Sequence, residues 1–139
     1  TAAVFHDGWY ITGDVAIIDD EGFITITDRL ARFSKIVGEM VSHTKVEDTL
    51  HELLGLTELT LAVASVPDHS RGERLVVLHT LPDGQVQELV AKLERCELPN
   101  LWRPRANAFH RVDAIPVLGT GKLDLKALKV LAAQVESAE

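Results

Sequence analysis

Hydrophobic and polar positions follow two different periods along this chain of 139 residues. Residues 8–30 contain short apolar runs separated by turn residues, a pattern that predicts a small β-meander. Beyond residue 32, apolar runs of strand length alternate with stretches in which apolar residues recur every three or four positions. The resulting order of strand, helix, strand, strand, helix, strand, helix predicts an α+β domain. In it, a small sheet of about three strands is covered by helices.

Boundary signals place the expected helices. The first is expected to open at Thr44, because Thr44 and Glu47 have the spacing of a capping box, and to end at Gly55. The second has an apolar face that begins at Val86. The third follows Asp124, whose side chain is expected to cap it.

Four segments are expected to form strands of this domain: residues 33–37, 59–66, 75–81 and 108–112. The second of these is expected to end at Pro67 and to pair with the third across a loop formed by residues 68–73. Trp102 lies between two prolines within residues 99–105, which we expect to be an anchored loop.

Composition restricts the possible functions. Hydrophobic residues make up 46% of the chain and charged residues 25%, the balance of a globular domain. The net charge of -7 argues against nucleic-acid binding through phosphate contacts, which needs a basic surface. The single cysteine, Cys96, excludes an internal disulfide, and no apolar run is long enough to span a membrane. The chain begins at Thr1 without methionine, and we interpret it as a piece of a longer protein.

Candidate chemistry centres on Lys122, at the end of a glycine-rich stretch just before the third expected helix. A compact, mobile ammonium group is suited to phosphate or to oxyanion charge that develops during a reaction. A phosphate-binding P-loop is excluded, because Pro116 stands where that motif needs glycine and Leu123 where it needs serine or threonine. The alternative is a flexible loop with an exposed lysine and no chemical role.

Two other groups of polar residues have the residue types of a site. Residues 28–35 carry three closely spaced cations, which indicates either a solvated connector or a junction that handles anions. His43, Glu47 and His51 lie at four-residue intervals, so a metal site on one helix is conceivable. We predict no metal there, because no further ligand is evident nearby and His51 is expected on the solvent side.

Four motifs occur in a set order along the chain: residues 8–14, residues 28–30, residues 35–38 with 46–47, and residues 119–124. In order and rough spacing they resemble the adenylate-forming enzymes, which include acyl-CoA synthetases, peptide-synthetase adenylation domains and luciferases. A narrower resemblance is to the acyl-acyl-carrier-protein synthetases, a branch that includes the 2-acylglycerophosphoethanolamine acyltransferases. Its motifs are residues 32–41, 98–105 and 115–124.

This resemblance implies part of a two-step enzyme. Residues 1–30 would end a large N-terminal domain and enter the hinge, and residues 31–139 would form a mobile C-terminal lid. In the family, a fatty acid or other carboxylate attacks the α-phosphate of ATP, which gives acyl-adenylate and pyrophosphate. A phosphopantetheine thiol, on acyl carrier protein or coenzyme A, then takes the acyl group and releases AMP. The narrower resemblance adds coupling to lysophospholipid acylation.

The family's site residues match five positions of this chain. Asp14 matches the aspartate that binds the ribose hydroxyls, and Arg29 matches an arginine that contacts the nucleotide near the ribose. Lys122 matches the lysine that bridges the reacting carboxylate and the α-phosphate. Gly38 matches the loop that approaches the pantetheine channel after the lid rotates. Lys35 matches a lysine placed near the active site in that second conformation.

Three positions depart from the family's pattern. Ala31 stands where the family has an aspartate or lysine at the hinge, so this chain lacks a charged hinge side chain. Hinges need not be of any particular residue type. His43 and Lys45 replace the family's proline and first glutamate before the helix, whereas Glu47 is retained.

The resemblance also implies what lies upstream: the adenine and acyl pockets and most ligands of Mg²⁺. We therefore predict that the isolated 139 residues have no ligase activity. A cytoplasmic location is expected for this domain, and association of the parent enzyme with the inner membrane stays open. The alternative function is a non-catalytic docking module for an acidic carrier protein or a partner domain. Its basic face would be formed by Arg29, Arg32, Arg71, Arg74, Arg103 and Arg105.

Overall fold

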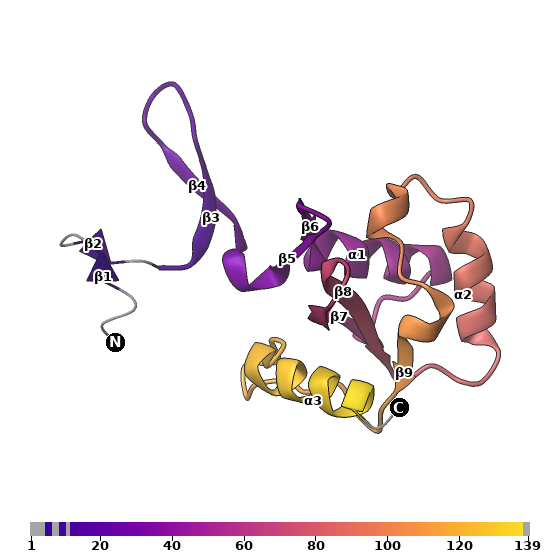
Figure 1. The fold of residues 1–139 in the computed structure, drawn as a ribbon. Coiled ribbons are helices and arrows are strands. Elements are labelled where there is room, and N and C mark those ends of the chain that lie inside the picture. The colour runs from indigo at the N-terminus through magenta and orange to yellow at the C-terminus, as the bar shows by residue number, and fades with distance from the viewer. Residues whose placement is uncertain (1–4, 7–8, 11, 138–139) are drawn as a thin grey trace. The chain divides into compact units, whose positions relative to one another are not determined.

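The computed structural model of the chain describes residues 5–6, 9–10 and 12–137. The chain divides into two compact units, Thr1–Phe33 and Ser34–Glu139. Figure 1 shows the helices and strands of each unit. Within the described residues, no helix combines the length and the apolar character that crossing a bilayer requires.

The first unit contains two short antiparallel hairpins rather than one continuous meander. Its strands are β1 (Phe5–His6), β2 (Trp9–Tyr10), β3 (Asp14–Ile18) and β4 (Ile24–Arg29). β1 pairs with β2 and β3 pairs with β4, and the two pairs belong to separate sheets. Positions 8 and 11, which belong to the segment predicted as a meander, lie outside the described residues.

The second unit is built on one five-stranded sheet with the order β6-β5-β8-β7, and β9 also pairs with β8. The strands are β5 (Phe33–Ile36), β6 (Glu39–Ser42), β7 (Leu61–Asp68), β8 (Gly72–His79) and β9 (Phe109–Arg111). β7 and β8 form an antiparallel hairpin, whereas β9 runs parallel to β8. The α+β class is confirmed, but the sheet is larger than the predicted three strands. β6 was not predicted, because the chain turns back after β5 where the sequence indicated only the end of a strand.

Both faces of the β7–β8 hairpin are covered by helices. Val63 and Val77 point to one face, where they join a core cluster with α1 (His43–Leu54) and α2 (Gln85–Leu93). Ala64 and Leu78 point to the other face and pack against α3 (Leu125–Ser137). Since neither face meets water, β7 and β8 need continuous apolar sequence, which explains why their runs lack polar alternation.

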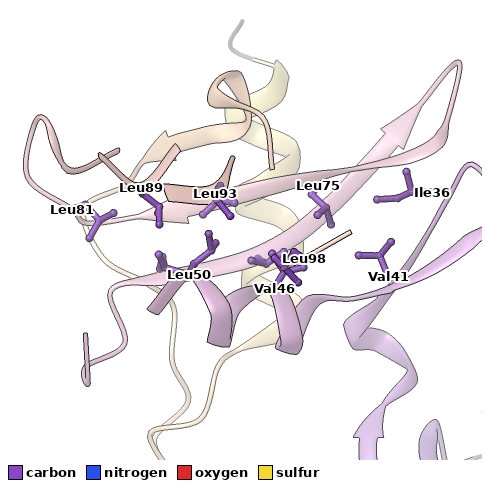
Figure 2. Packing of buried hydrophobic residues seen from close by; sticks show 12 residues of the cluster. Ile36, Val41, Val46, Leu50, Leu75, Leu81, Leu89, Leu93 and Leu98 are labelled. Atoms are coloured by element: carbon purple, nitrogen blue, oxygen red, sulfur yellow. The ribbon is translucent and has the colours of Figure 1, made fainter. Parts of the chain in front are cut away.

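Figure 2 shows the cluster on the first of these faces. Val46 and Leu50 from α1 and Leu89 from α2 have no exposed surface, and Leu98 from the following loop is also buried. Each such leucine contributes roughly 1.5–3 kcal/mol relative to an exposed one. This packing holds α1, α2 and the loop after α2 on one face of the sheet.

The capping box predicted at Thr44 is wrong. The N-cap residue of α1 is Ser42, whose Oγ accepts from the amide of Lys45 at 3.2 Å, so Thr44 and Glu47 lie inside the helix. Glu47 Oε2 accepts the amide of Val63 on β7 at 2.9 Å. The predicted end of the helix is confirmed: Gly55 has a φ of 67°, in the left-handed region.

β7 continues through Pro67 to Asp68 and does not end at the proline. Pro67 lies opposite Glu73 of β8, at the edge of the sheet. An edge strand has one side without a partner strand, so a residue without an amide hydrogen can be accommodated there. The predicted loop is correspondingly shorter, since Asp68 and Gly72 already pair.

His79 makes the stability of this unit dependent on pH. Burial, together with nearby Arg111 and His110, lowers the pKa of His79. Its Nδ1 accepts the amide of Leu81 at 3.2 Å, so a proton at that nitrogen would break the bond. The unfolded chain therefore binds a proton more readily than the folded one near pH 6.5 and below.

We expect the free energy of unfolding to be constant with respect to His79 above about pH 6.5 and to fall as the pH drops below it. The loss continues until the pH reaches the lowered pKa and is at most about 1.4 kcal/mol per pH unit for one group. Urea unfolding of the wild type and of a His79→Gln variant between pH 7.5 and 5 measures this. Equal pH slopes for the two proteins would contradict the assignment.

Candidate functional site

Lys122 lies at the base of a tight hairpin between β9 and α3. The amide of Leu118 donates to the carbonyl of Lys122 at 2.7 Å, and the amide of Gly121 donates to the carbonyl of Leu118 at 2.9 Å. Val117 and Leu123 form a β-bridge below them. Gly121 has a φ of 86°, so the turn needs glycine at this position.

Helix α3 holds the base of this hairpin. Asp124 Oδ1 accepts the amide of Ala127 at 3.1 Å, which is the helix cap predicted from the sequence. The amide of Asp124 donates to the carbonyl of Pro116 at 3.0 Å and closes the hairpin. Leu123 packs partly buried beneath α3, whereas the neighbouring Lys122 is exposed. The hairpin thus presents the Lys122 ammonium to solvent from an ordered backbone.

Asp14 and Arg29 are brought together in the first unit. They lie opposite each other in the β3–β4 pair, and Arg29 Nη1 donates to Asp14 Oδ1 at 2.7 Å. The arginine side chain is 59% exposed and the aspartate side chain 20%, so both groups are accessible. The carboxylate keeps Oδ2 as a hydrogen-bond acceptor for hydroxyl groups beside a fixed positive charge.

Lys35 and Gly38 lie on the β5–β6 hairpin of the second unit. Val37 and Gly38 form its turn with φ values of 50° and 81°, the positive pair that a type I′ turn requires. A β-branched residue is an outlier in this region, and the amide of Val37 is held by the carbonyl of Arg71 at 2.9 Å. An added Cβ at Gly38 would meet no atom within 4 Å, so space does not require glycine there. The positive φ of this position does favour glycine. The exposed Lys35 is anchored through its amide, which donates to Glu73 at 2.7 Å.

The predicted site residues therefore occupy three places in the fold. Asp14 and Arg29 form one pair in the first unit. Lys35 and Gly38 share the β5–β6 hairpin, and Lys122 lies on a different hairpin, between β9 and α3.

The arginines proposed as a basic face separate into distinct environments. Arg32 is buried, with 6% of its surface exposed, and so does not belong to a docking surface. Four others line one hollow of about 200 Å³ in the second unit, over the apolar side chains of Ile36 and Leu75. The four are Arg71, Arg74, Arg103 and Arg105. Sequence reasoning found these residues but had no signal that the fold would gather them.

The four arginines differ in what they already bind. Arg74 pairs with carboxylates on β7 and α3. Arg103 donates to the carbonyls of Leu98 and Cys96, each at 2.8 Å, and to a third carbonyl at the end of α2. The side chains of Arg71 and Arg105 form no ion pair with a described residue. Carbonyls carry no net charge, so Arg71, Arg103 and Arg105 all keep a positive charge that no ion pair with a described residue offsets, and of these only the Arg103 side chain is already held by hydrogen bonds.

The three residues considered for a metal site each have a structural partner. His43 Nε2 is hydrogen-bonded to the hydroxyl of buried Ser34. Glu47 accepts the amide of Val63, and His51 Nε2 faces the amide of Thr60 at 3.4 Å. These contacts hold α1 against β5 and against the beginning of β7. Within the described residues, no group of three potential ligands is arranged to hold a metal ion.

No protein-family model matches the sequence. The chain is 34% identical over 131 residues to 4-hydroxybutyrate–CoA ligase 2 of Metallosphaera sedula, covering 93% of the chain and 23% of that protein. It is 36% identical over 126 residues to a long-chain-fatty-acid–CoA ligase of Bacillus subtilis, covering 88% of the chain and 22% of that protein.

Solved structures give the same result. A Mycobacterium tuberculosis fatty acyl CoA synthetase matches 96% of the chain and 26% of its own, with a TM-score of 0.68 and 30% identity. ATP-bound MatB from Rhodopseudomonas palustris matches 97% of the chain and 27% of its own, with a TM-score of 0.71 and 22% identity, and so supports the fold alone. The chain spans about a quarter of the length of these proteins. In sequence and fold, this chain is thus a homologue of the AMP-forming acyl-CoA ligases and is consistent with a C-terminal domain of an adenylate-forming enzyme.

Proposed function

We propose that the chain is the C-terminal part of an AMP-forming fatty acyl ligase, in which residues 1–30 end the large domain and residues 31–139 form the lid. The observation that carries this proposal is the Lys122 hairpin, which presents an exposed ammonium group on an ordered turn at a position matching the family's catalytic lysine. The relatives named above are CoA ligases, which supports the reaction class.

The surface of the first unit supports a larger parent. Six large apolar residues around the β3–β4 hairpin are more than half exposed: Ile17, Ile18, Phe23, Ile24, Ile26 and Leu30. A two-stranded hairpin is at best marginally stable alone in water and needs a further apolar surface to pack against. The proposed large domain upstream would supply that surface.

In the first step, the fatty acid carboxylate attacks the α-phosphorus of ATP and the bond to the β-phosphate oxygen breaks, which releases pyrophosphate. Lys122 would contact the carboxylate and the α-phosphate as they approach, and its charge would offset the negative charge that meets there. Asp14 would accept hydrogen bonds from the ribose hydroxyls, with Arg29 beside it. Mg²⁺, which would neutralise phosphate charge, would be bound mainly by the upstream domain.

In the second step, a phosphopantetheine thiol attacks the acyl carbonyl and AMP leaves. Lys35 and Gly38, on the β5–β6 hairpin, would lie near the pantetheine channel and the active site during this step. The narrower resemblance favours acyl carrier protein as the thiol donor, with transfer to a lysophospholipid afterwards, and coenzyme A is the alternative acceptor. A cytoplasmic location of this domain would give access to either donor.

The second candidate function is docking without catalysis, favoured by the arginine-lined hollow. The test is to measure pyrophosphate release by the full-length parent enzyme with ATP and a long-chain fatty acid, and then acyl transfer to holo-acyl carrier protein or coenzyme A. Pyrophosphate release that depends on fatty acid supports the ligase. Carrier binding without such release would replace it with the docking module.

Charge reversal of Arg71 and Arg105 should separate the two half-reactions. The side chains of Arg71 and Arg105 form no ion pair with a described residue, and both line one hollow. Arg71→Glu with Arg105→Glu should therefore slow acyl transfer to an acidic carrier protein by roughly tenfold and leave adenylation nearly unchanged. Arg95→Glu, on an exposed arginine outside the hollow, is the matched control. Slowing in Arg95→Glu equal to that in either single variant, Arg71→Glu or Arg105→Glu, would mean that net charge alone is responsible.

A further inference from the structure

A chain of charged side chains joins the last turn of α3 to the sheet. Glu136 Oε1 is 2.9 Å from Nε2 of His110 on β9, and Glu136 Oε2 accepts from Arg74 on β8. Arg74 also lies 3.6 Å from Asp68 at the end of β7. One helix residue thereby contacts two strands directly and is linked to a third.

This cluster is not an exposed surface pair. The side chains of His110 and Glu136 are only 8% and 10% exposed. The pKa of Asp68 is lowered, mainly by hydrogen bonds from Ser70. Asp68 therefore stays anionic and favours the orientation of Arg74, which lies 3.6 Å away. A buried carboxylate with both oxygens engaged is costly to leave without its partners, so the contact restrains where the helix lies.

The cluster joins the two elements, β9 and α3, that flank the Lys122 hairpin in the sequence. The hairpin that carries Lys122 lies in the connection between β9 and α3, and His110 and Glu136 belong to those two elements. At the other end of α3, Asp124 caps the helix and also closes the hairpin. Any tilt or slide of α3 on the sheet would therefore move the hairpin with it.

A small change in the orientation of α3 would move the hairpin by a large distance. The helix rests on the sheet through buried Leu128 and Ala132, which pack in one cluster with Ala62, Ala64, Val66, Val76 and Leu78. Over eleven residues at about 1.5 Å rise, a tilt of about 10° at the Glu136 end displaces the first turn by about 3 Å.

We infer that Glu136 is a positioning residue for Lys122: through His110 and Arg74 it fixes the orientation of α3 and thereby the location of the lysine hairpin. This inference rests on the proposed role of Lys122 in adenylation. The Glu136 contacts lie at the opposite end of α3 from the Lys122 hairpin.

The test uses the full-length parent enzyme with Glu136→Gln, which keeps the size of the side chain and removes its charge. We expect adenylation to fall about tenfold, with little change in the KM for ATP. Asp83→Asn is the matched control, because Asp83 is a carboxylate that pairs with Arg111 on β9 but is 97% exposed. His110→Gln removes the other half of the contact and should change adenylation in the same direction.

Two further measurements distinguish positioning from general destabilisation. Hydrogen exchange should quicken at the hairpin amides of Leu118, Gly121 and Asp124 in Glu136→Gln and stay unchanged in the core of β7. In a Lys122→Ala background, Glu136→Gln should cause no additional loss of adenylation, because it acts through Lys122.

Uniformly faster exchange, or an additive loss in the double variant, would overturn the inference. The exchange measurement also separates this inference from the proposed function. If Lys122→Ala leaves adenylation intact, the proposed function fails, and the hairpin amides still report whether Glu136 holds the hairpin. If those amides are unaffected while Lys122→Ala abolishes adenylation, the positioning role fails and the proposed function stands.

Discussion

Replacing Lys122 by alanine in the full-length parent enzyme is expected to lower pyrophosphate release with ATP and fatty acid by about 100-fold or more. The reason is electrostatic: a carboxylate and a phosphate must approach each other, and a positioned cation offsets the charge that develops between them. The hairpin makes the effect large, because hydrogen bonds on both sides of the turn fix the backbone that carries the ammonium group.

The fold should not change in Lys122→Ala, since this side chain is exposed. Lys126→Ala removes another exposed lysine from the first turn of α3 and is the matched control. Lys122→Arg keeps the charge but spreads it over a planar group, and should recover only part of the rate. Unchanged pyrophosphate release in Lys122→Ala would favour the docking function over catalysis. The family relationship would then reflect common ancestry without a shared reaction.

The second large effect is expected in stability, from Arg103→Lys. Arg103 donates to three carbonyls, those of Glu94, Cys96 and Leu98, after the end of α2. A lysine ammonium lacks the planar fork that meets several fixed acceptors at once, so part of this set would lose its partner. Hydrogen bonds to charged groups contribute about 1.5–3 kcal/mol each, and we expect a loss of about 2–3 kcal/mol in the free energy of unfolding.

Denaturant unfolding of this chain measures that loss. Arg105→Lys is the control two residues away, since Arg105 is exposed and has no ion pair with a described residue, and it should stay within about 0.5 kcal/mol of the wild type. The loop held by Arg103 also carries Leu98 into the core beside α2. A loss below about 0.5 kcal/mol would show that the carbonyls find water as an equivalent partner.

Local periodicity determined much of this protein without any tertiary information. The apolar runs of β7 and β8, the apolar faces of the three helices, the Asp124 cap and the Gly55 end all follow from interactions within a few residues. The five candidate site residues were also assigned from the sequence, through the resemblance of its ordered motifs to the adenylate-forming enzymes. Their roles as an active site remain predictions.

Only the tertiary structure decided which of several possible partners each polar residue takes. Glu47 had the spacing of a capping box, yet its carboxylate accepts a hydrogen bond from the amide of Val63, sixteen residues away on β7. Arg103 and Arg105 are two residues apart and look alike in the sequence. Arg103 is hydrogen-bonded to the carbonyl of Leu98 and holds a loop, whereas Arg105 lines the hollow without an ion pair to a described residue. Glu136 had no sequence signal at all, because its partners on β8 and β9 come near only after α3 has packed on the sheet. Short-range patterns specify elements, whereas the use of a charge depends on which elements the fold places beside it.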